Sequence, residues 1–185
     1  MPGVVAIALA TLHRNLRVVG ILGRGDKPLL CVDIDGVISL FGYDQPTEEA
    51  PGEFHLVDGI LHCISMATGP RLNRLAESYD LVWASGWEDR ANDYLPHILG
   101  VPKLPYLTFN GATFGTAHWK LAPISAYAKE RPLAWIDDSF DPSCYEWAEE
   151  RDAPTLLVPT DPGIGLEEGH VAALESWAAD DYEVR

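Results

Sequence analysis

The sequence predicts an α/β fold: a Rossmann-like three-layer sandwich with a mainly parallel five-stranded core sheet and a small β-hairpin flap. Short apolar runs alternate along the chain with longer segments of helical periodicity, which is the pattern of strands joined by crossover helices. The apolar runs are continuous, as expected for strands that are buried on both faces of a parallel sheet. Asp58-Gly59, between two β-forming runs, indicates a hairpin.

Two strands, a hairpin and a helix are expected in the first half of the chain. Residues 28–33 are an apolar run that ends in an acid, and they predict a buried strand. Residues 53–65 predict the hairpin, because Asp-Gly suits the positive φ angles of a tight turn. Residues 70–79 predict a helix, with a proline near its start and leucines on one face. Residues 80–85 form a second apolar run and predict the next strand.

The rest of the chain continues the alternation of helices and strands. A helix is expected over residues 87–99, because Gly100 suits the left-handed conformation of a helix C-cap. The remaining helices are expected over 122–129, 143–151 and 169–179. The remaining strands are expected over 104–109, 132–137 and 155–158.

The chain of 185 residues has the length of one ordinary domain. We expect residues 29–185 to form this domain, with the flap over about residues 38–68, and residues 1–28 to be an N-terminal extension. The extension carries four basic residues and one acidic residue, although the net charge of the whole chain is −15. So strong a negative charge repels phosphate backbones and argues against general nucleic-acid binding.

Three features of the sequence favour a cytoplasmic protein. No apolar stretch approaches the roughly 18 residues of a membrane span, so no membrane association is expected. The basic residues near the N-terminus follow the apolar segment over residues 4–12, whereas in a secretory signal they precede it. Three cysteines without CxxC spacing suit a reducing compartment and give no zinc motif.

Two acids follow the first expected strand at a spacing of two. If the extended geometry continues, Asp33 and Asp35 point to the same side, and Gly36 permits a sharp turn away from the sheet. Like charges so close together are unfavourable unless a cation or a proton neutralises one of them. The pattern therefore indicates a site for a cation or for proton transfer, although Asp and Gly at a strand end also suit an ordinary solvated turn.

A second acidic group, Asp137, Asp138 and Asp141, follows the strand expected over residues 132–137. The carboxyl ends of parallel strands meet at one edge of a sheet, so the two acidic groups would converge there. Carboxylate-rich sites select hard cations such as Mg²⁺. Asp138 and the serine after it also suit the N-cap of the next helix. Both roles are compatible if Asp137 binds the metal and Asp141 or Ser143 caps the helix.

Three further residues are candidates for binding phosphate. Ser85 and Gly86 follow the second expected strand, where a hydroxyl and backbone N–H groups at a helix start can bind an anion, although Ser85 suits helix capping equally well. A lone lysine such as Lys120 is commonly a solvated surface charge, but a phosphoryl site among so many acids needs one well-placed cation. The six histidines show no HxH or HxxxH spacing, and His118 is the nearest to Lys120.

The order of these motifs resembles the haloacid dehalogenase superfamily over about residues 29–160: Asp-x-Asp-Gly-Val after an apolar strand, then a strand-ending serine, a lysine and a strand-ending Asp-Asp pair. The likeness is to short, phosphatase-like members without a large cap domain. It implies that Asp33 is the nucleophile and forms an aspartyl-phosphate, and that Asp35 is the general acid and then the general base. Asp35 favours phosphoryl transfer over carbon–halogen cleavage, because a leaving oxygen needs a proton.

The resemblance also implies which residues bind the metal and the phosphoryl group. The ligands of Mg²⁺ would be Asp33, Asp35 through its backbone carbonyl, Asp137, and Asp138 as an alternate ligand or as support for one. The groups that hold the phosphoryl oxygens would be Ser85, Gly86 and Lys120. The spacing leaves open whether Asp138 or Asp141 supports the metal.

In this family a cap inserted after the first or the second motif selects the substrate. Here the first insertion, over residues 38–68, contains only one hairpin. Only residues 100–119 lie between the second helix and Lys120, so a large cap does not fit there either. An open site suits a large phosphorylated substrate, or closure by a partner chain or a dimer.

Two alternative functions remain: a Mg²⁺-dependent nuclease-type enzyme and a catalytically silent binding module. Lys120 and Ser85 favour the phosphatase over the nuclease, and the retained acid pair argues against the silent module.

Overall fold

A computed structural model describes residues 27–44, 49–109 and 115–183, so nearly all of the expected N-terminal extension lies outside the described residues. The strands are β1 (Leu29–Val32), β2 (Ser39–Leu40), β3 (Glu53–Val57), β4 (Ile60–Ile64), β5 (Asp80–Trp83), β6 (Leu133–Asp137) and β7 (Thr155–Pro159). The α-helices are α1 (Thr68–Leu75), α2 (Ala91–Leu99), α3 (Leu121–Ala128), α4 (Pro142–Glu150) and α5 (Glu168–Glu183). The described residues also contain the short 3₁₀ helices η2 (Glu88–Arg90) and η3 (Ala117–Lys120).

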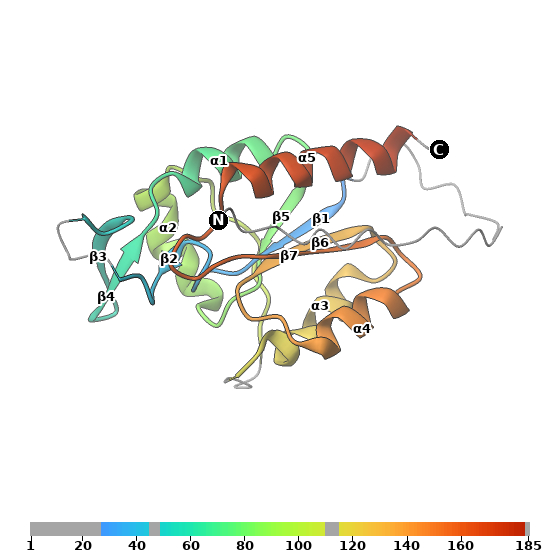
Figure 1. The fold of residues 1–185 in the computed structure, drawn as a ribbon, viewed down its shortest axis with the longest axis horizontal. Helices are drawn as coiled ribbons and strands as arrows, with labels where there is room; N and C mark the ends of the chain where they lie inside the picture. Colours follow the sequence, from blue (N-terminus) through green and yellow to red (C-terminus); the bar gives the residue numbers. More distant parts are fainter. Residues whose placement is uncertain (1–26, 45–48, 110–114, 184–185) are drawn as a thin grey trace, which may run out of the picture.

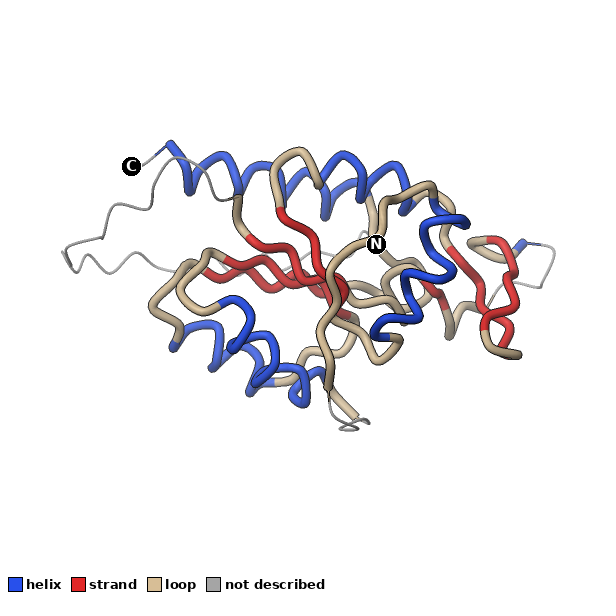
Figure 2. The backbone as a smooth tube through the Cα atoms, turned by 180° about the vertical axis from the view of Figure 1, so that it is seen from behind, coloured by secondary structure: helices blue, strands red, loops and turns tan. Residues whose placement is uncertain are grey.

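Four parallel strands form the main sheet, in the order β5-β1-β6-β7. Because successive side chains of a strand point to opposite faces, each strand contributes to two cores. Leu30 and Val32 of β1 belong to the core beneath α1, α2 and α5, whereas Leu29 and Cys31 belong to the core beneath α3 and α4. Figures 1 and 2 show α1 and α5 on one side of the sheet and α3 and α4 on the other. The predicted α/β fold with a parallel sheet between helices is therefore confirmed.

The expected fifth strand, over residues 104–109, is reduced to a single bridge between Tyr106 and Trp83 of β5. The N–H of Trp83 donates to the carbonyl of Pro105, and the N–H of Leu107 donates to the carbonyl of Trp83, both at 2.9 Å. Continuing this parallel ladder toward Leu81 would need an N–H at position 105, which a proline lacks. The main sheet of the described residues therefore has four strands, and the prediction of five is not confirmed.

The flap is a three-stranded antiparallel sheet in the order β2-β4-β3. Its β3 and β4 form the expected hairpin, in which Val57 pairs with Ile60 across Asp58-Gly59. Both turn residues have positive φ angles, 50° and 81°, as a type I′ turn requires. The sequence does not predict β2, because two residues are too few to show a period. Figure 1 shows the flap at the end of the molecule away from the C-terminus.

All five expected helices form, with ends that shift by a few residues. The segment expected as one helix over residues 87–99 begins with η2 and continues as α2, and Gly100 caps it with a φ of 67°, as predicted. The largest differences are in α1, which ends at Leu75, and in α5, which continues to Glu183. At 16 residues α5 is the longest described helix, and none of the described helices is long and apolar enough to cross a membrane.

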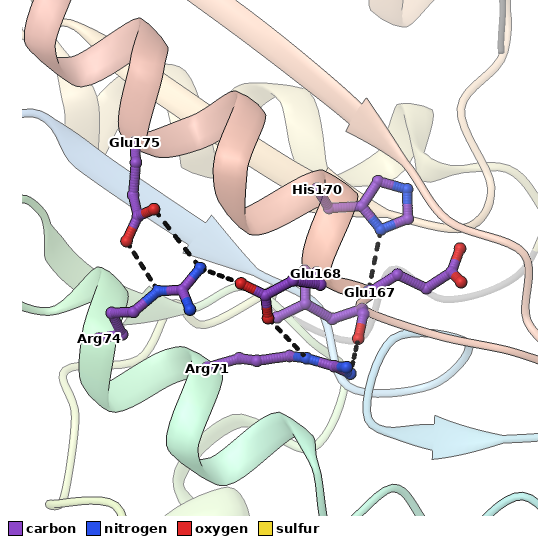
Figure 3. A network of polar contacts seen from close by, with 7 residues as sticks. Arg71, Arg74, Glu167, Glu168, His170 and Glu175 are labelled. Atoms are coloured by element: carbon purple, nitrogen blue, oxygen red, sulfur yellow. Dashed lines mark hydrogen bonds and ion pairs between the residues drawn. The ribbon is translucent and has the colours of Figure 1, made fainter.

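Ion pairs join α1 to α5 across the top of the sheet (Figure 3). Arg74 of α1 contacts both Glu168 and Glu175 of α5, with its Nε 2.8 Å from Glu175 Oε1. Arg71 also reaches across and donates to the carbonyl of Leu166 at 2.6 Å. Because these side chains are partly exposed, water weakens each pair. The pairs therefore align the two helices, while the apolar core beneath them supplies most of the stability.

Candidate functional site

The carboxyl ends of the central strands bring the predicted site residues to one edge of the sheet. Val32 of β1 pairs with Ile136 of β6, and the N–H of Asp33 donates to the Ile136 carbonyl at 3.1 Å, so Asp33 lies beside Asp137. Strand β5 flanks β1 on its other side in a parallel register and brings Ser85 to the same edge. This is the edge at which ligands bind in sheets of this kind.

Three carboxylates meet at this edge: Asp33, Asp137 and Asp138, which we call the acid cluster. One oxygen from each lies within 4.8 Å of the other two, close enough for a single metal ion to contact all three. Asp33 and Asp137 are buried, and Asp138 is half-buried. The acid cluster could therefore hold a metal ion, and a donor set made only of oxygens suits a hard cation.

Lys120 enters the acid cluster from the end of η3. Its Nζ lies 2.7 Å from Oδ2 of Asp137 and 2.8 Å from Oδ2 of Asp33, and the residue is 3% exposed. Burial alone would lower the pKa of Lys120, but the charges of the two aspartates outweigh burial and raise this pKa. The ammonium therefore keeps its proton. The sequence leaves open whether Lys120 is a solvated surface charge or a cation within the site. The structure shows that it is a buried cation.

The acid cluster carries more negative charge than Lys120 offsets. Burial raises the pKa of Asp137 to about 7, and the charge of Asp33 adds to this rise while Lys120 opposes it. Burial and the charge of Asp33 also raise the pKa of Asp138 to about 6. Near neutral pH the acid cluster therefore gains from binding either a proton or a cation.

Asp35 lies outside the acid cluster, and its side chain is 52% exposed. Its Oδ2 accepts a hydrogen bond from Trp87 Nε1 at 3.1 Å, and its Oδ1 lies 4.0 Å from His62 Nδ1. Partial removal from water, and then the charge of Asp33, raise the pKa of Asp35, which favours a protonated carboxyl group. The metal contact that the resemblance implies for the Asp35 backbone carbonyl stays a prediction.

Ser85 and Gly86 follow β5 at the same edge of the sheet as the acid cluster. Ser85 is buried, and its Oγ accepts a hydrogen bond from the N–H of Trp87 at 3.4 Å, so the hydroxyl supports the turn that leads into η2. Gly86 is exposed, and a Cβ added there would meet only the Trp119 ring, 3.9 Å away. The space beside Gly86 is therefore open. Phosphate binding by these two residues stays a prediction.

Asp141, the last acid of the second group, caps α4. Its side chain accepts hydrogen bonds from the N–H of Cys144, at 3.3 Å, and from the hydroxyls of Thr116 and Ser143. The two hydroxyl bonds lower the pKa of Asp141. Asp138 instead joins the acid cluster. Of the two acids that the sequence could not distinguish, Asp138 is therefore the one placed to support a metal ion.

His62 of the flap lies beside Asp35, a contact that the sequence does not predict. Its ring meets the ring of Trp87 edge to face, with centroids 4.8 Å apart. The register of the hairpin indicates which residues share a face with His62. No local pattern shows which face of the flap lies toward Asp35. His118, the histidine nearest to Lys120 in the sequence, is exposed and forms a 2.6 Å hydrogen bond with Ser143 instead.

Thr160, just after β7, links the two acidic segments. Its hydroxyl donates to the carbonyl of Gly36 at 2.9 Å, and its N–H donates to the carbonyl of Asp137 at 3.1 Å. The residue is buried, so water competes little for these hydrogen bonds. The contact joins segments that are 124 residues apart, and no sequence signal identifies it.

Comparison with known proteins adds no family assignment: no protein-family model matches this chain, and no curated protein matches it. The resemblance to the haloacid dehalogenase superfamily rests on the order of the motif residues. The meeting of the acid cluster with Lys120 is a separate observation that does not depend on that resemblance.

Proposed function

We propose that this protein is a Mg²⁺-dependent phosphoric monoester hydrolase that acts through an aspartyl-phosphate intermediate. The observation that carries the proposal is the meeting of the acid cluster and buried Lys120 at the carboxyl edge of a parallel sheet. Asp35 adds a separate carboxyl group with a raised pKa beside this cluster. A nucleophile, a cation and a proton donor are what phosphoryl transfer to a carboxylate needs. The small flap suits a large phosphorylated substrate or closure by a partner chain.

The acid cluster fits a Mg²⁺ ion, because its ligands are all oxygens. Burial, and then the charge of Asp33, raise the pKa of Asp137 and of Asp138, so a bound cation would stabilise both carboxylates. Asp33, Asp137 and Asp138 would hold the ion, together with the backbone carbonyl of Asp35. When bound, Mg²⁺ reduces the repulsion between the Asp33 carboxylate and a phosphate dianion.

The first step forms the intermediate on Asp33. A carboxylate oxygen of Asp33 bonds to phosphorus while the bond between phosphorus and the leaving oxygen breaks, and the electron pair stays on that oxygen. Asp35 gives its proton to the leaving oxygen, which departs as an alcohol. Lys120, Ser85 and Gly86 bind the phosphoryl oxygens. Burial, and then the charge of Asp33, raise the pKa of Asp35, which is the direction that a general acid requires.

The second step hydrolyses the intermediate and restores the enzyme. A water molecule attacks phosphorus, and Asp35, now a carboxylate, accepts the proton of that water. The bond from phosphorus to Asp33 breaks, inorganic phosphate leaves, and Asp35 is protonated again. The exposure of Asp35 allows water to reach it after the alcohol has left.

The proposal is tested by measuring phosphate release from 4-nitrophenyl phosphate with Mg²⁺ or EDTA. We expect Mg²⁺-dependent release by the wild type and a loss of at least about 1,000-fold in Asp33→Asn, because the amide is not a nucleophile. Asp141→Asn is the matched control. It makes the same change in an acid that caps α4, and Asn also caps helices, so we expect activity within about 3-fold of the wild type.

Two results would contradict the proposal. Full activity in Asp33→Asn would exclude an aspartyl-phosphate at this position. A folded wild type that releases no phosphate from aryl or alkyl monoesters would exclude the monoester hydrolase. Cleavage of an oligonucleotide without phosphate release would then favour the nuclease-type alternative, and the absence of both activities would favour the binding module.

A reducing compartment such as the cytoplasm is the location that we propose. Cys31, Cys63 and Cys144 are all free and buried. Burial raises the pKa of Cys31 to about 12, so this thiol stays protonated and unreactive. Buried cysteines that form no disulfide suit a compartment in which disulfides do not form.

A further inference from the structure

Asp35 is flanked by two side chains from different parts of the chain. Trp87, which follows β5, donates its indole N–H to Oδ2 of Asp35 at 3.1 Å, and His62 of β4 places Nδ1 4.0 Å from Oδ1. The rings of His62 and Trp87 pack edge to face, with centroids 4.8 Å apart. Oδ2 of Asp35 is therefore hydrogen-bonded to Trp87, whereas Oδ1 faces the His62 ring at a distance longer than a hydrogen bond, and the two rings pack against each other.

The flap determines where His62 lies. Ser39 of β2 is buried, and a 2.8 Å hydrogen bond joins its Oγ to His62 Nδ1. Leu61, the preceding residue on β4, is 63% exposed on the opposite face, whereas the side chain of His62 is 16% exposed. Alternation along the strand thus turns His62 toward Asp35. The hydrogen bond to Ser39 fixes the orientation of the ring.

We propose that His62 is a positioning residue that, together with Trp87, holds the Asp35 carboxyl in the orientation in which it protonates the leaving oxygen. This inference rests on the proposed function and adds the flap to the acid–base machinery. The carboxyl of Asp35 is half exposed, so without neighbours it would sample several rotamers. Proton transfer is efficient only when the donor is held within hydrogen-bond reach of the leaving oxygen.

The leaving group distinguishes this role from general structural support. An alkyl phosphate releases an alcohol that must receive a proton as the bond to phosphorus breaks, whereas 4-nitrophenyl phosphate releases a stable anion without one. The ratio kcat/KM reports steps up to the breaking of that bond, so it does not contain the later attack of water. A defect in Asp35 positioning therefore lowers kcat/KM for the alkyl ester more than for the aryl ester, while a general loss of structure lowers both equally.

The experiment compares kcat/KM for propyl phosphate and 4-nitrophenyl phosphate in the wild type and in His62→Ala at one pH with saturating Mg²⁺. We expect the alkyl-to-aryl ratio to fall by about 10-fold or more, a part of the 10²–10⁴-fold effect that general acid catalysis commonly supplies. Trp87→Phe, which keeps a ring but removes the indole N–H, should lower the same ratio. His62→Gln, which can still hydrogen bond to Ser39, should retain more of it than His62→Ala.

His55→Ala is the matched control. His55 pairs directly with His62 in the hairpin, so the change removes the same ring from the same sheet, but the charged partner of His55 is Glu53. We expect its alkyl-to-aryl ratio to equal that of the wild type. If His62→Ala does not fold, Trp87→Phe decides.

The outcomes separate the two proposals. An active wild type whose ratio is unchanged by His62→Ala or, where that variant does not fold, by Trp87→Phe overturns the positioning role and leaves the hydrolase intact. A ratio that falls equally in His55→Ala also overturns it, since the effect would then belong to the hairpin as a whole. A wild type that hydrolyses neither ester overturns the proposed function and this inference together.

Discussion

Asp138 shows how a single carboxylate links the site to the stability of the fold. Its pKa rises from 3.8 to about 6, through burial and then through the charge of Asp33. Between these pH values the folded protein holds a proton that the unfolded chain has released. The free energy of unfolding therefore decreases as the pH rises through this window. The cost is absent below pH 3.8 and complete above pH 6.

We expect Asp138→Asn to be more stable than the wild type at pH 7.5 without metal, by on the order of 1–2 kcal/mol after allowing for solvent around a half-buried group. The amide keeps the shape but cannot ionise. The advantage should shrink at pH 4.5, where Asp138 is largely protonated. Urea unfolding in EDTA at the two pH values measures the difference, and an advantage that does not change with pH would contradict the assignment.

The same variant should lose its advantage when Mg²⁺ is added at pH 7.5. The wild type then gains a neutralising ion at Asp138, whereas the amide is a weaker ligand. The sign of the stability difference should therefore reverse with saturating Mg²⁺. An unchanged sign would place the metal away from Asp138.

At the scale of an element, the loop between β1 and β2 depends on Gly36. This residue has a φ of +74°, and a Cβ added to it would lie 2.3 Å from Cγ of Asp138. Its carbonyl also accepts the hydrogen bond from Thr160. The absence of a side chain at Gly36 therefore leaves the space that the Asp138 carboxylate occupies.

We expect Gly36→Ala to weaken Mg²⁺ binding by about 10-fold or more, because the added methyl group must displace Asp138. A Mg²⁺ titration followed by thermal unfolding measures the apparent affinity. Gly42→Ala is the control, since Gly42 has the same φ of +74° but nothing within 4 Å of an added Cβ. Both variants carry the strain of a left-handed alanine, so equal Mg²⁺ affinities would show that the contact with Asp138 does not matter.

For the whole molecule, a bound cation should act on global stability, because the site joins strands and loops from across the chain. At 100 times its Kd, an ion that binds only the folded state adds about 2.7 kcal/mol. For a chain of this length that corresponds to a rise in Tm of about 5–10 °C. We expect Mg²⁺ to produce this rise in the wild type and not in Asp137→Asn.

The net charge of −15 requires a control for this measurement, since any salt weakens the repulsion among so many acids. NaCl at matched ionic strength should raise the Tm much less than Mg²⁺ does. An equal rise with both salts would indicate general screening and would argue against a specific metal site.

Local chemistry determined much of the fold. Continuous apolar runs predicted the four strands of the main sheet, because a strand that is buried on both faces has no room for polar residues. Asp58-Gly59 predicted the hairpin, because few other pairs adopt two positive φ angles easily. The strand ends also predicted that Asp33 and Asp137 would meet, since parallel strands share one carboxyl edge.

Contacts between distant segments were decided only by the tertiary structure. The hydrogen bond between Trp87 and Asp35 joins residues 52 positions apart, and the one between Ser39 and His62 joins residues 23 positions apart. No local sequence pattern therefore predicts either contact. Whether Lys120 is a surface charge or a buried cation depends on how η3 packs against β1 and β6. Within one element, the periodicity of the sequence shows which side chains share a face. Which face of that element lies against another element depends on the packing of the whole chain, and this packing brings the site residues together.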